Sequence, residues 1–179
     1  GRAHDWQTLL AAARELADDD RIRFLCTGGG HGYGKLREAV EAEGLQGRFR
    51  FLPYQPREHL AASLQVPDVH WFSLKPHLTP FIFPSKFFGI LQAGRPVIFI
   101  GLPESEIAAT IREQSIGAVV PEGDVRGMAG AIRELRADAS ALREAGARAR
   151  AYWEAHCSKE REINRSEERR VGKECATGC

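Results

Sequence analysis

Residues 83–101 read FPSKFFGILQAGRPVIFIG, and this stretch decides the fold class of the chain. Its Pro-Ser-Lys opening predicts an apolar helix over 85–93, and the apolar run behind the Gly-Arg-Pro turn predicts a buried strand over 97–100. A helix that begins beside a strand edge offers free backbone N–H groups and the positive end of its dipole to an anion. Ser85 and Lys86 would add a hydroxyl and a full positive charge there. The same residues also fit a helix capped by Ser85 whose lysine is only solvated.

The pattern of alternating helices and strands extends over most of the chain. Several of the strands are continuous apolar runs, as in strands that are covered on both faces. We therefore expect an α/β protein with a doubly wound parallel sheet, in which ligands bind outside the carboxyl ends of the strands. Helices are predicted over 6–17, 34–43, 56–64, 85–93, 104–114, 125–136 and 139–156, and strands over 22–27, 49–52, 68–73, 97–100 and 118–120.

The bulk composition indicates a soluble globular protein with one ordinary core. The chain has 179 residues, 43% of them apolar and 27% charged, and a formal net charge of +1. This balance does not favour a nucleic-acid partner. We find no apolar run of the roughly 20 residues that a membrane span needs, and no signal-peptide pattern. The four cysteines lack CxxC spacing, and Cys26 reads as a core residue, so a reducing, cytoplasmic location is expected.

The glycine-rich turn TGGGHGYGKL, residues 27–36, comes close to two nucleotide-binding motifs without matching either. A P-loop requires a Ser or Thr, which would bind magnesium, where Leu36 stands, and the dinucleotide motif requires a glycine where Tyr33 stands. Gly28 and Gly30 more simply allow a tight turn from strand to helix and a close approach of the backbone to a ligand.

Catalytic side chains are sparse at the predicted ligand edge. No Ser/His/Asp or Cys/His arrangement, carboxylate pair or metal-ligand cluster can be assembled from the spacing. Glu104 and Glu106 are the acids that follow a buried strand on this edge. Acids in the first turn of a helix are also favoured by the helix dipole alone.

Five blocks in this order resemble the donor-binding half of a GT-B glycosyltransferase, most closely the family 4 enzymes of exopolysaccharide, O-antigen and colanic-acid synthesis. They are GRAHDWQTLLAAA, FLCTGGG, FLPYQPREHLAASL, the Pro-Ser-Lys stretch with ESEIAATI and GAVVPEGD, and WEAHCSKERE. The resemblance covers residues 1–163. It implies a Rossmann-like domain that lacks its first strand and the acceptor-binding domain that precedes it in such enzymes.

The resemblance also implies roles for individual residues. Lys86 and Arg2 would face the donor diphosphate as catalytic cations, and Ser85 would meet the phosphates at the helix N-terminus. Glu106 would hydrogen-bond sugar or ribose hydroxyls. Gly28 and Gly30, with the backbone around Tyr54, would line the nucleobase pocket.

The chain departs from the family pattern at three places. The family often pairs the arginine with a nearby lysine, but His4 and Asp5 stand there instead. The two glutamates that usually contact the sugar and the ribose are replaced by Phe81 and Gly89.

The activity implied is retaining transfer of a sugar from a nucleotide-diphosphate donor, expected to be a UDP-sugar, to a cell-surface polysaccharide or lipid-linked glycan. The donor would be the substrate, and no metal or other cofactor is expected, because cations would replace magnesium. Without the acceptor domain the chain alone would be inactive. The complete enzyme would be cytoplasmic, with peripheral association at the inner face of the membrane. A nucleotide-sugar epimerase of the same fold and a non-catalytic nucleotide-binding module are the alternatives.

The end of the chain does not fit this pattern. Residues 165–175, RSEERRVGKEC, resemble a translated sequencing adapter, although a genuine charged tail reads the same way. We therefore expect residues 164–179 to form a non-native or disordered tail outside the domain.

Overall fold

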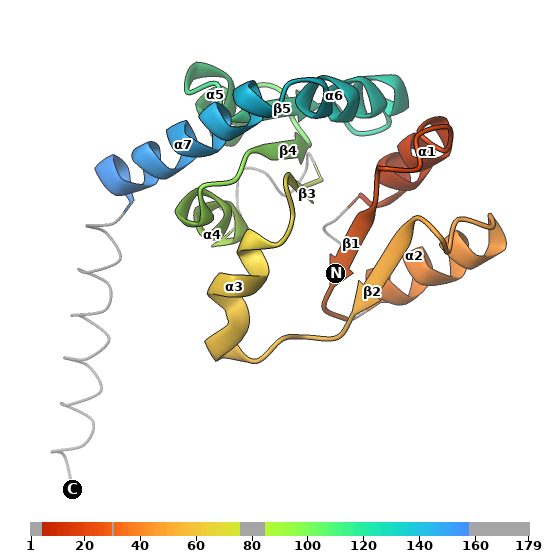
Figure 1. Cartoon of the computed structure of the whole chain (residues 1–179). Coiled ribbons are helices and arrows are strands. Elements are labelled where there is room, and N and C mark those ends of the chain that lie inside the picture. The colour runs from red at the N-terminus through yellow and green to blue at the C-terminus, as the bar shows by residue number, and fades with distance from the viewer. Residues whose placement is uncertain (1–4, 30, 76–84, 158–179) are drawn as a thin grey trace, which may run out of the picture.

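The computed structural model describes residues 5–29, 31–75 and 85–157, and it contains the predicted alternation of helices and strands (Figure 1). Helix α2 begins earlier than the predicted start at residue 34, because the glycine turn is shorter than its composition suggests. The helices are α1 (Gln7–Glu15), α2 (His31–Ala42), the 3₁₀ turn η1 (Arg57–His59), α3 (Leu60–Gln65), α4 (Ser85–Ala93), α5 (Glu106–Glu113), α6 (Val125–Ala137) and α7 (Ala139–His156). The strands are β1 (Phe24–Thr27), β2 (Phe49–Leu52), β3 (His70–Ser73), β4 (Val97–Ile100) and β5 (Gly117–Val120).

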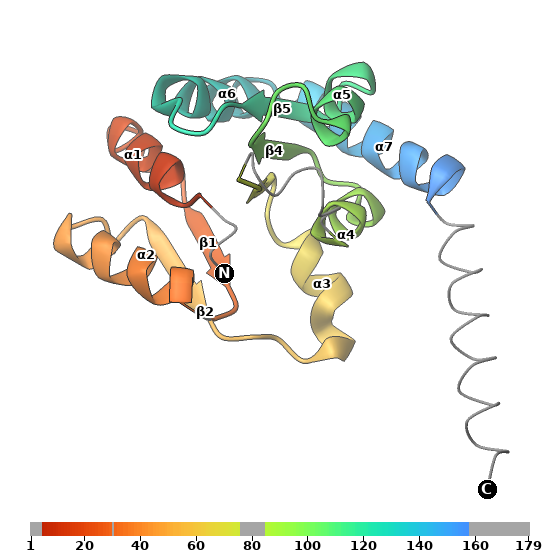
Figure 2. The same cartoon turned by 180° about the vertical axis from the view of Figure 1, so that it is seen from behind.

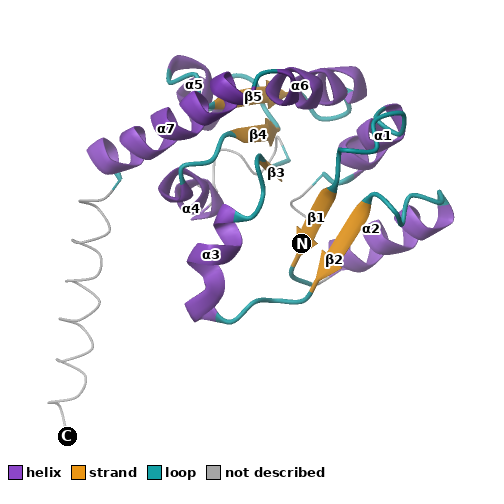
Figure 3. Cartoon of the chain, viewed as in Figure 1, coloured by secondary structure: helices purple, strands orange, loops and turns teal. Residues whose placement is uncertain are grey.

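The strands form two parallel sheets (Figure 3). One is the pair β1–β2, and the other has the order β3–β4–β5. Within the described ranges no strand is hydrogen-bonded between β1 and β3, so each of these two strands has one unpaired edge. The α/β class with parallel strands is therefore confirmed, but the strands are divided between two sheets.

Strand β4 shows why the three-stranded sheet is doubly wound. Ile98 and Ile100 point into a core shared with α1 and α6. Val97 and Phe99 point into a second core shared with α4, α5 and α7. All four side chains are at most 2% exposed, which for a β-strand requires a cover on both faces.

The pair β1–β2 is covered on one face by α1 and α2, which lie beside it in both views (Figures 1 and 2). Phe24 and Phe49 are buried on this face, and their rings stack with centroids 4.8 Å apart. On the other face Arg50 is exposed and lies opposite Leu25 in the register. The alternation of apolar and exposed residues in β2 is that of a half-covered strand.

Helix α7 packs tightly against the turn between α4 and β4. Gly94 adopts a φ of +66°, a conformation that glycine reaches without strain. A Cβ placed on Gly146 of α7 would lie 2.4 Å from the carbonyl oxygen of Gly94. Beside this contact the Arg150 guanidinium donates a hydrogen bond of 2.7 Å to the carbonyl of Gln92. The turn that leads into β4 is thus held from outside by α7.

Two side chains fasten the end of helix α3 to the second sheet. The Nε2 atom of His70 lies 2.7 Å from the carbonyl oxygen of Leu64, which fixes Nε2 as the protonated nitrogen, and Arg95 donates to the carbonyl of Gln65. Burial lowers the pKa of His70, and the positive charge of Arg95 lowers it further, against the opposing effect of the hydrogen bond to Leu64. The folded protein therefore favours the neutral imidazole.

Candidate functional site

The topology of β3, α4 and β4 leads us to expect Ser85 and Lys86 near the carboxyl edge of the second sheet. Helix α4 has 9 residues and is about 13–14 Å long at 1.5 Å per residue. Strand β4 has 4 residues and is about 13 Å long. Strands β3 and β4 are parallel, so the segment between them must return from the carboxyl end of β3 to the amino end of β4. Helix α4 ends three residues before β4, and we therefore expect its first turn to face the carboxyl edge of the sheet.

The first turn of α4 leaves its polar residues exposed while its apolar residues anchor the helix. Ser85 and Lys86 are both exposed, whereas Phe87 is 1% exposed and packs in the second core. The first turn contains no acidic residue. Among the described residues Lys86 has no ion-pair partner, so its charge is available to an anion beside the helix N-terminus.

Glu106 occupies the first turn of α5, which follows β4 on the same edge. It is exposed, and the helix begins at Ser105, whose hydroxyl oxygen accepts a 3.3 Å hydrogen bond from the Ala108 N–H. In the preceding loop Gly101 has no room for a side chain, since a Cβ would lie 2.9 Å from the carbonyl oxygen of Leu74. The backbone segments that follow β3 and β4 therefore approach each other closely at Leu74 and Gly101.

Gly28 and Tyr54 meet at the carboxyl edge of the first sheet. Gly28 adopts a φ of +130°, and a Cβ there would lie 3.4 Å from the Tyr54 ring. The Gly28 N–H donates 3.0 Å to the carbonyl of Leu52, and the Tyr33 hydroxyl donates to the same carbonyl at 3.0 Å. The Tyr54 side chain is 77% exposed. It forms an aromatic surface beside a bare glycine backbone.

Four of the residues named from the sequence, Arg2, His4, Gly30 and Phe81, lie outside the described residues, as does the predicted tail 164–179. Gly89 lies in the middle of α4, where a Cβ would come within 3.3 Å of Leu64. Glycine at position 89 therefore allows α4 to pack closely against α3.

The structure brings Gly28 and Tyr54 together, whereas Ser85, Lys86 and Glu106 are exposed in the first turns of α4 and α5 without a contact between them. It also reveals buried polar residues that the sequence patterns did not indicate, Asp5, Thr8 and Ser73. The spacing Asp5-x-x-Thr8 at the start of a helix is a capping signal that could have identified the first two.

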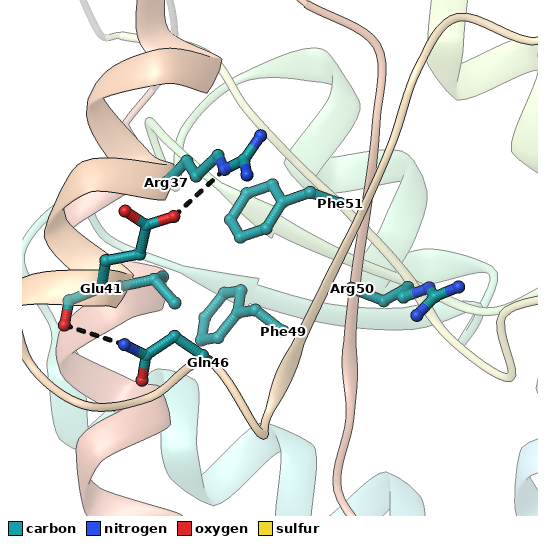
Figure 4. A pocket seen from close by; sticks show the side chains of 7 residues that line it. Arg37, Glu41, Gln46, Phe49, Arg50 and Phe51 are labelled. Atoms are coloured by element: carbon teal, nitrogen blue, oxygen red, sulfur yellow. Dashed lines mark hydrogen bonds and ion pairs between the residues drawn. The ribbon is translucent and has the colours of Figure 1, made fainter.

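The hollow drawn in Figure 4 lies away from these edges. Its volume is about 260 Å³, and it lies between α2 and β2, where Arg37 is ion-paired with Glu41. Its lining contains Arg37, Val40, Glu41, Gln46, Phe49, Arg50 and Phe51, of which Arg50 points away from the helix. None of the predicted site residues lines it.

The remaining candidate side chains do not add a reactive group to the edge. In the ranges described, no three His, Cys, Asp or Glu residues gather as metal ligands. His70 stands at the amino end of β3, opposite the candidate edge. Burial raises the pKa of the Cys26 thiol to about 11, which agrees with the predicted core role of this residue.

Comparison with known protein families identifies one family. A family model described as "Glycosyl transferases group 1" matches residues 1–138. No curated protein sequence matches the chain.

Three solved structures resemble the chain in fold. Sucrose-phosphate synthase from Thermosynechococcus elongatus is 22% identical with a TM-score of 0.67, and the match covers 93% of this chain and 43% of the synthase. A mutant of Staphylococcus aureus TarM, in complex with UDP and other ligands, is 15% identical with a TM-score of 0.71, and the match covers 89% of this chain and 31% of TarM. HepE from Anabaena, in complex with UDP-glucose, is 17% identical with a TM-score of 0.65, and the match covers 82% of this chain and 40% of HepE. The chain thus spans less than half of each of these proteins.

Proposed function

The chain belongs to the group 1 glycosyl transferases, and we propose that it is the part of such an enzyme that binds the nucleotide-sugar donor. The single observation that carries this proposal is Lys86, which is exposed in the acid-free first turn of α4, the helix that leads into β4. A diphosphate at this point would meet a full positive charge, the Ser85 hydroxyl and the free N–H groups of the helix.

This arrangement suits the chemistry of sugar transfer. When the sugar leaves, negative charge develops on the departing diphosphate. Fixed cations and helix N–H groups then stabilise the transition state more than the ground state. Lys86 would act in this way, and we propose that Arg2 supplies a second cation. No metal is needed in this scheme, because protein charges take its place.

The other predicted residues complete a donor site in this proposal. Gly28, Gly30 and the segment at Tyr54 would line the nucleobase pocket, which is supported by the contact between Gly28 and the exposed Tyr54 ring. Glu106 would accept hydrogen bonds from sugar or ribose hydroxyls, which is supported by its exposure at the start of α5.

We propose a UDP-sugar as the donor, transferred with retention to a cell-surface polysaccharide or lipid-linked glycan in the manner of the family 4 enzymes. The UDP-glucose and UDP named for the HepE and TarM structures support this choice of donor. No helix of the described residues combines the length and apolar character of a bilayer span. Our proposal for the location is the cytoplasm, at the inner face of the membrane.

We assign the donor domain to residues 1–163 and propose that the acceptor is bound by a separate domain. This agrees with the fraction of the solved structures that the chain spans, at most 43%. The unpaired edges of β1 and β3 also fit our proposal that one parallel strand of the domain is missing between the two sheets.

Calorimetric titration of this 179-residue chain with UDP tests the proposal, with ATP as the competing nucleotide. We expect UDP to bind and Lys86→Ala to weaken binding by about ten- to a hundredfold, the effect of losing a hydrogen bond to a charged group of about 1.5–3 kcal/mol. The matched control is Arg143→Ala, which removes an equal charge from an exposed position on α7.

The outcomes separate the possible functions. UDP binding that Lys86→Ala weakens and Arg143→Ala leaves unchanged supports a donor site at α4. Preferential binding of ATP would instead indicate a non-catalytic nucleotide-binding module. If neither nucleotide binds, or if both variants behave alike, the phosphate role of Lys86 is wrong.

A further inference from the structure

Tyr33 links the first turn of α2 to the last residue of β2. It stands where the dinucleotide motif would have a glycine, and it is half-buried. Its hydroxyl donates a 3.0 Å hydrogen bond to the carbonyl of Leu52. Its ring lies edge-on to Phe51, with centroids 5.3 Å apart and ring planes at 84°. The side chain of Tyr33 is therefore held both at its ring and at its hydroxyl.

The carbonyl that Tyr33 binds marks the point where the chain leaves the first sheet. Leu52 is the last residue of β2, and the same carbonyl accepts a 3.0 Å hydrogen bond from the backbone N–H of Gly28. A backbone carbonyl oxygen can accept with two lone pairs, and here both have a donor. The direction of this carbonyl is therefore fixed from two sides, by the glycine turn and by α2.

This direction is passed along the backbone toward Tyr54. The Leu52 carbonyl and the nitrogen of Pro53 lie in one peptide plane, and the proline ring fixes the next φ angle. The carbonyl of Pro53 in turn accepts a 3.0 Å hydrogen bond from the side-chain amide of Gln55. The backbone that leads to Tyr54 thus has little rotational freedom left.

The Tyr54 ring depends on this backbone for its place, because little else holds it. The side chain is 77% exposed. Its ring lies along the glycine turn, where a Cβ added to Gly28 or Gly29 would come within 3.4 or 3.2 Å of it. With so little packing around the ring, the segment that carries it decides where its open face stands.

We propose that Tyr33 is a positioning residue of the donor site, which acts on the nucleobase through Tyr54. This inference rests on the proposed function, in which Tyr54 belongs to the nucleobase pocket. Stacking between flat rings depends on their distance and offset, so a ring that tilts or shifts binds a base less tightly. The hydroxyl of Tyr33 would therefore contribute to donor affinity without touching the donor.

The experiment is a double-mutant cycle read by calorimetric titration with UDP. Tyr33→Phe removes only the hydroxyl and keeps the ring beside Phe51. Tyr152→Phe is the matched control, because it makes the same chemical change on α7, where Tyr152 packs against the second core. Both variants are made with Tyr54 present and with Tyr54→Ala, and the melting temperature is recorded in parallel.

The expected changes in affinity follow from the loss of one hydrogen bond. With Tyr54 present, Tyr33→Phe should weaken UDP binding by about three- to tenfold, the effect of one neutral hydrogen bond. With Tyr54→Ala, the same change should alter the affinity by less than about twofold, because the ring that Tyr33 positions is gone. Tyr152→Phe should stay within about twofold in both backgrounds.

A loss of UDP affinity that appears only when Tyr54 is present supports the inference. An equal loss in both backgrounds would show a merely structural role for Tyr33, and unchanged affinity would show that it positions nothing; either result overturns the inference. If Tyr33→Phe does not fold, Gln55→Leu, which releases the Pro53 carbonyl, decides in the same way.

The same measurements separate this inference from the proposed function. If the unmodified chain binds UDP and Tyr54→Ala binds it equally well, the role of Tyr33 is refuted while the donor site stands. Absence of UDP binding by the unmodified chain would instead refute the proposed function, and the inference with it.

Discussion

Replacing Gly146 by alanine tests the close packing of α7 on the turn before β4. The new Cβ would lie 2.4 Å from the Gly94 carbonyl oxygen, where contacts under 3.0 Å are almost never seen, so helix and turn must separate by about 0.6 Å. Overpacking of this kind costs about 1–3 kcal/mol, and the upper end applies because the obstructing atom belongs to the backbone. Alanine recovers about 1 kcal/mol of helix propensity. We expect a net loss of about 2 kcal/mol in the free energy of unfolding.

Gly130→Ala is the matched control, because Gly130 lies inside α6, where a Cβ added to it would have no neighbouring atom within 4 Å. The same chemical change there should increase stability by about 1 kcal/mol through helix propensity alone. The two variants should therefore differ by about 3 kcal/mol. For a domain of this size that is a difference of about 6–12 °C in melting temperature.

The assay is thermal and urea unfolding of both variants, followed by far-UV circular dichroism in the same buffer. The urea midpoint should shift at constant m-value, which shows that the native packing and not the unfolded chain has changed. If Gly146→Ala is as stable as Gly130→Ala, α7 does not approach Gly94 as the structure has it, and the arrangement of the second core would need revision.

Two further predictions concern the candidate edge and the base of β3. Tyr54→Ala should weaken UDP binding by about tenfold or more, because stacking of a base on an aromatic ring contributes about 1–3 kcal/mol. Tyr54→Phe keeps the aromatic ring and should keep most of the affinity. If calorimetry finds the same affinity for both variants and the unmodified chain, Tyr54 does not belong to the base pocket. For His70, burial lowers the folded pKa below the ordinary 6.5, so the unfolded state binds more protons between those two values. The free energy of unfolding should thus rise with pH through this window, and the contribution of His70 should reach its full value above about pH 6.5. Urea midpoints measured from pH 4.5 to 8 should rise less steeply in His70→Gln than in the unmodified chain. A pH profile identical in the two proteins would contradict this account.

Much of the architecture follows from local sequence patterns. The apolar run at 97–100 predicts a strand covered on both faces, and β4 is buried on both, because side chains of a strand alternate between its faces wherever it lies. The Pro-Ser-Lys opening likewise predicts the start of α4 at Ser85, since the signals that begin a helix lie within a few residues. The sequence also predicts that Gly28 forms a turn, as its positive φ confirms.

Only the tertiary structure decides which strands pair and which distant residues meet. The division into the pair β1–β2 and the sheet β3–β4–β5 depends on hydrogen bonds between segments with no sequence signal for each other. The same holds for the bond from Asp5 to Ser73 and for the approach of Gly146 to Gly94. Periodicity reports which face of an element is buried but not what buries it, and these contacts join residues 52 to 68 positions apart, whose meeting depends on the packing of the whole chain.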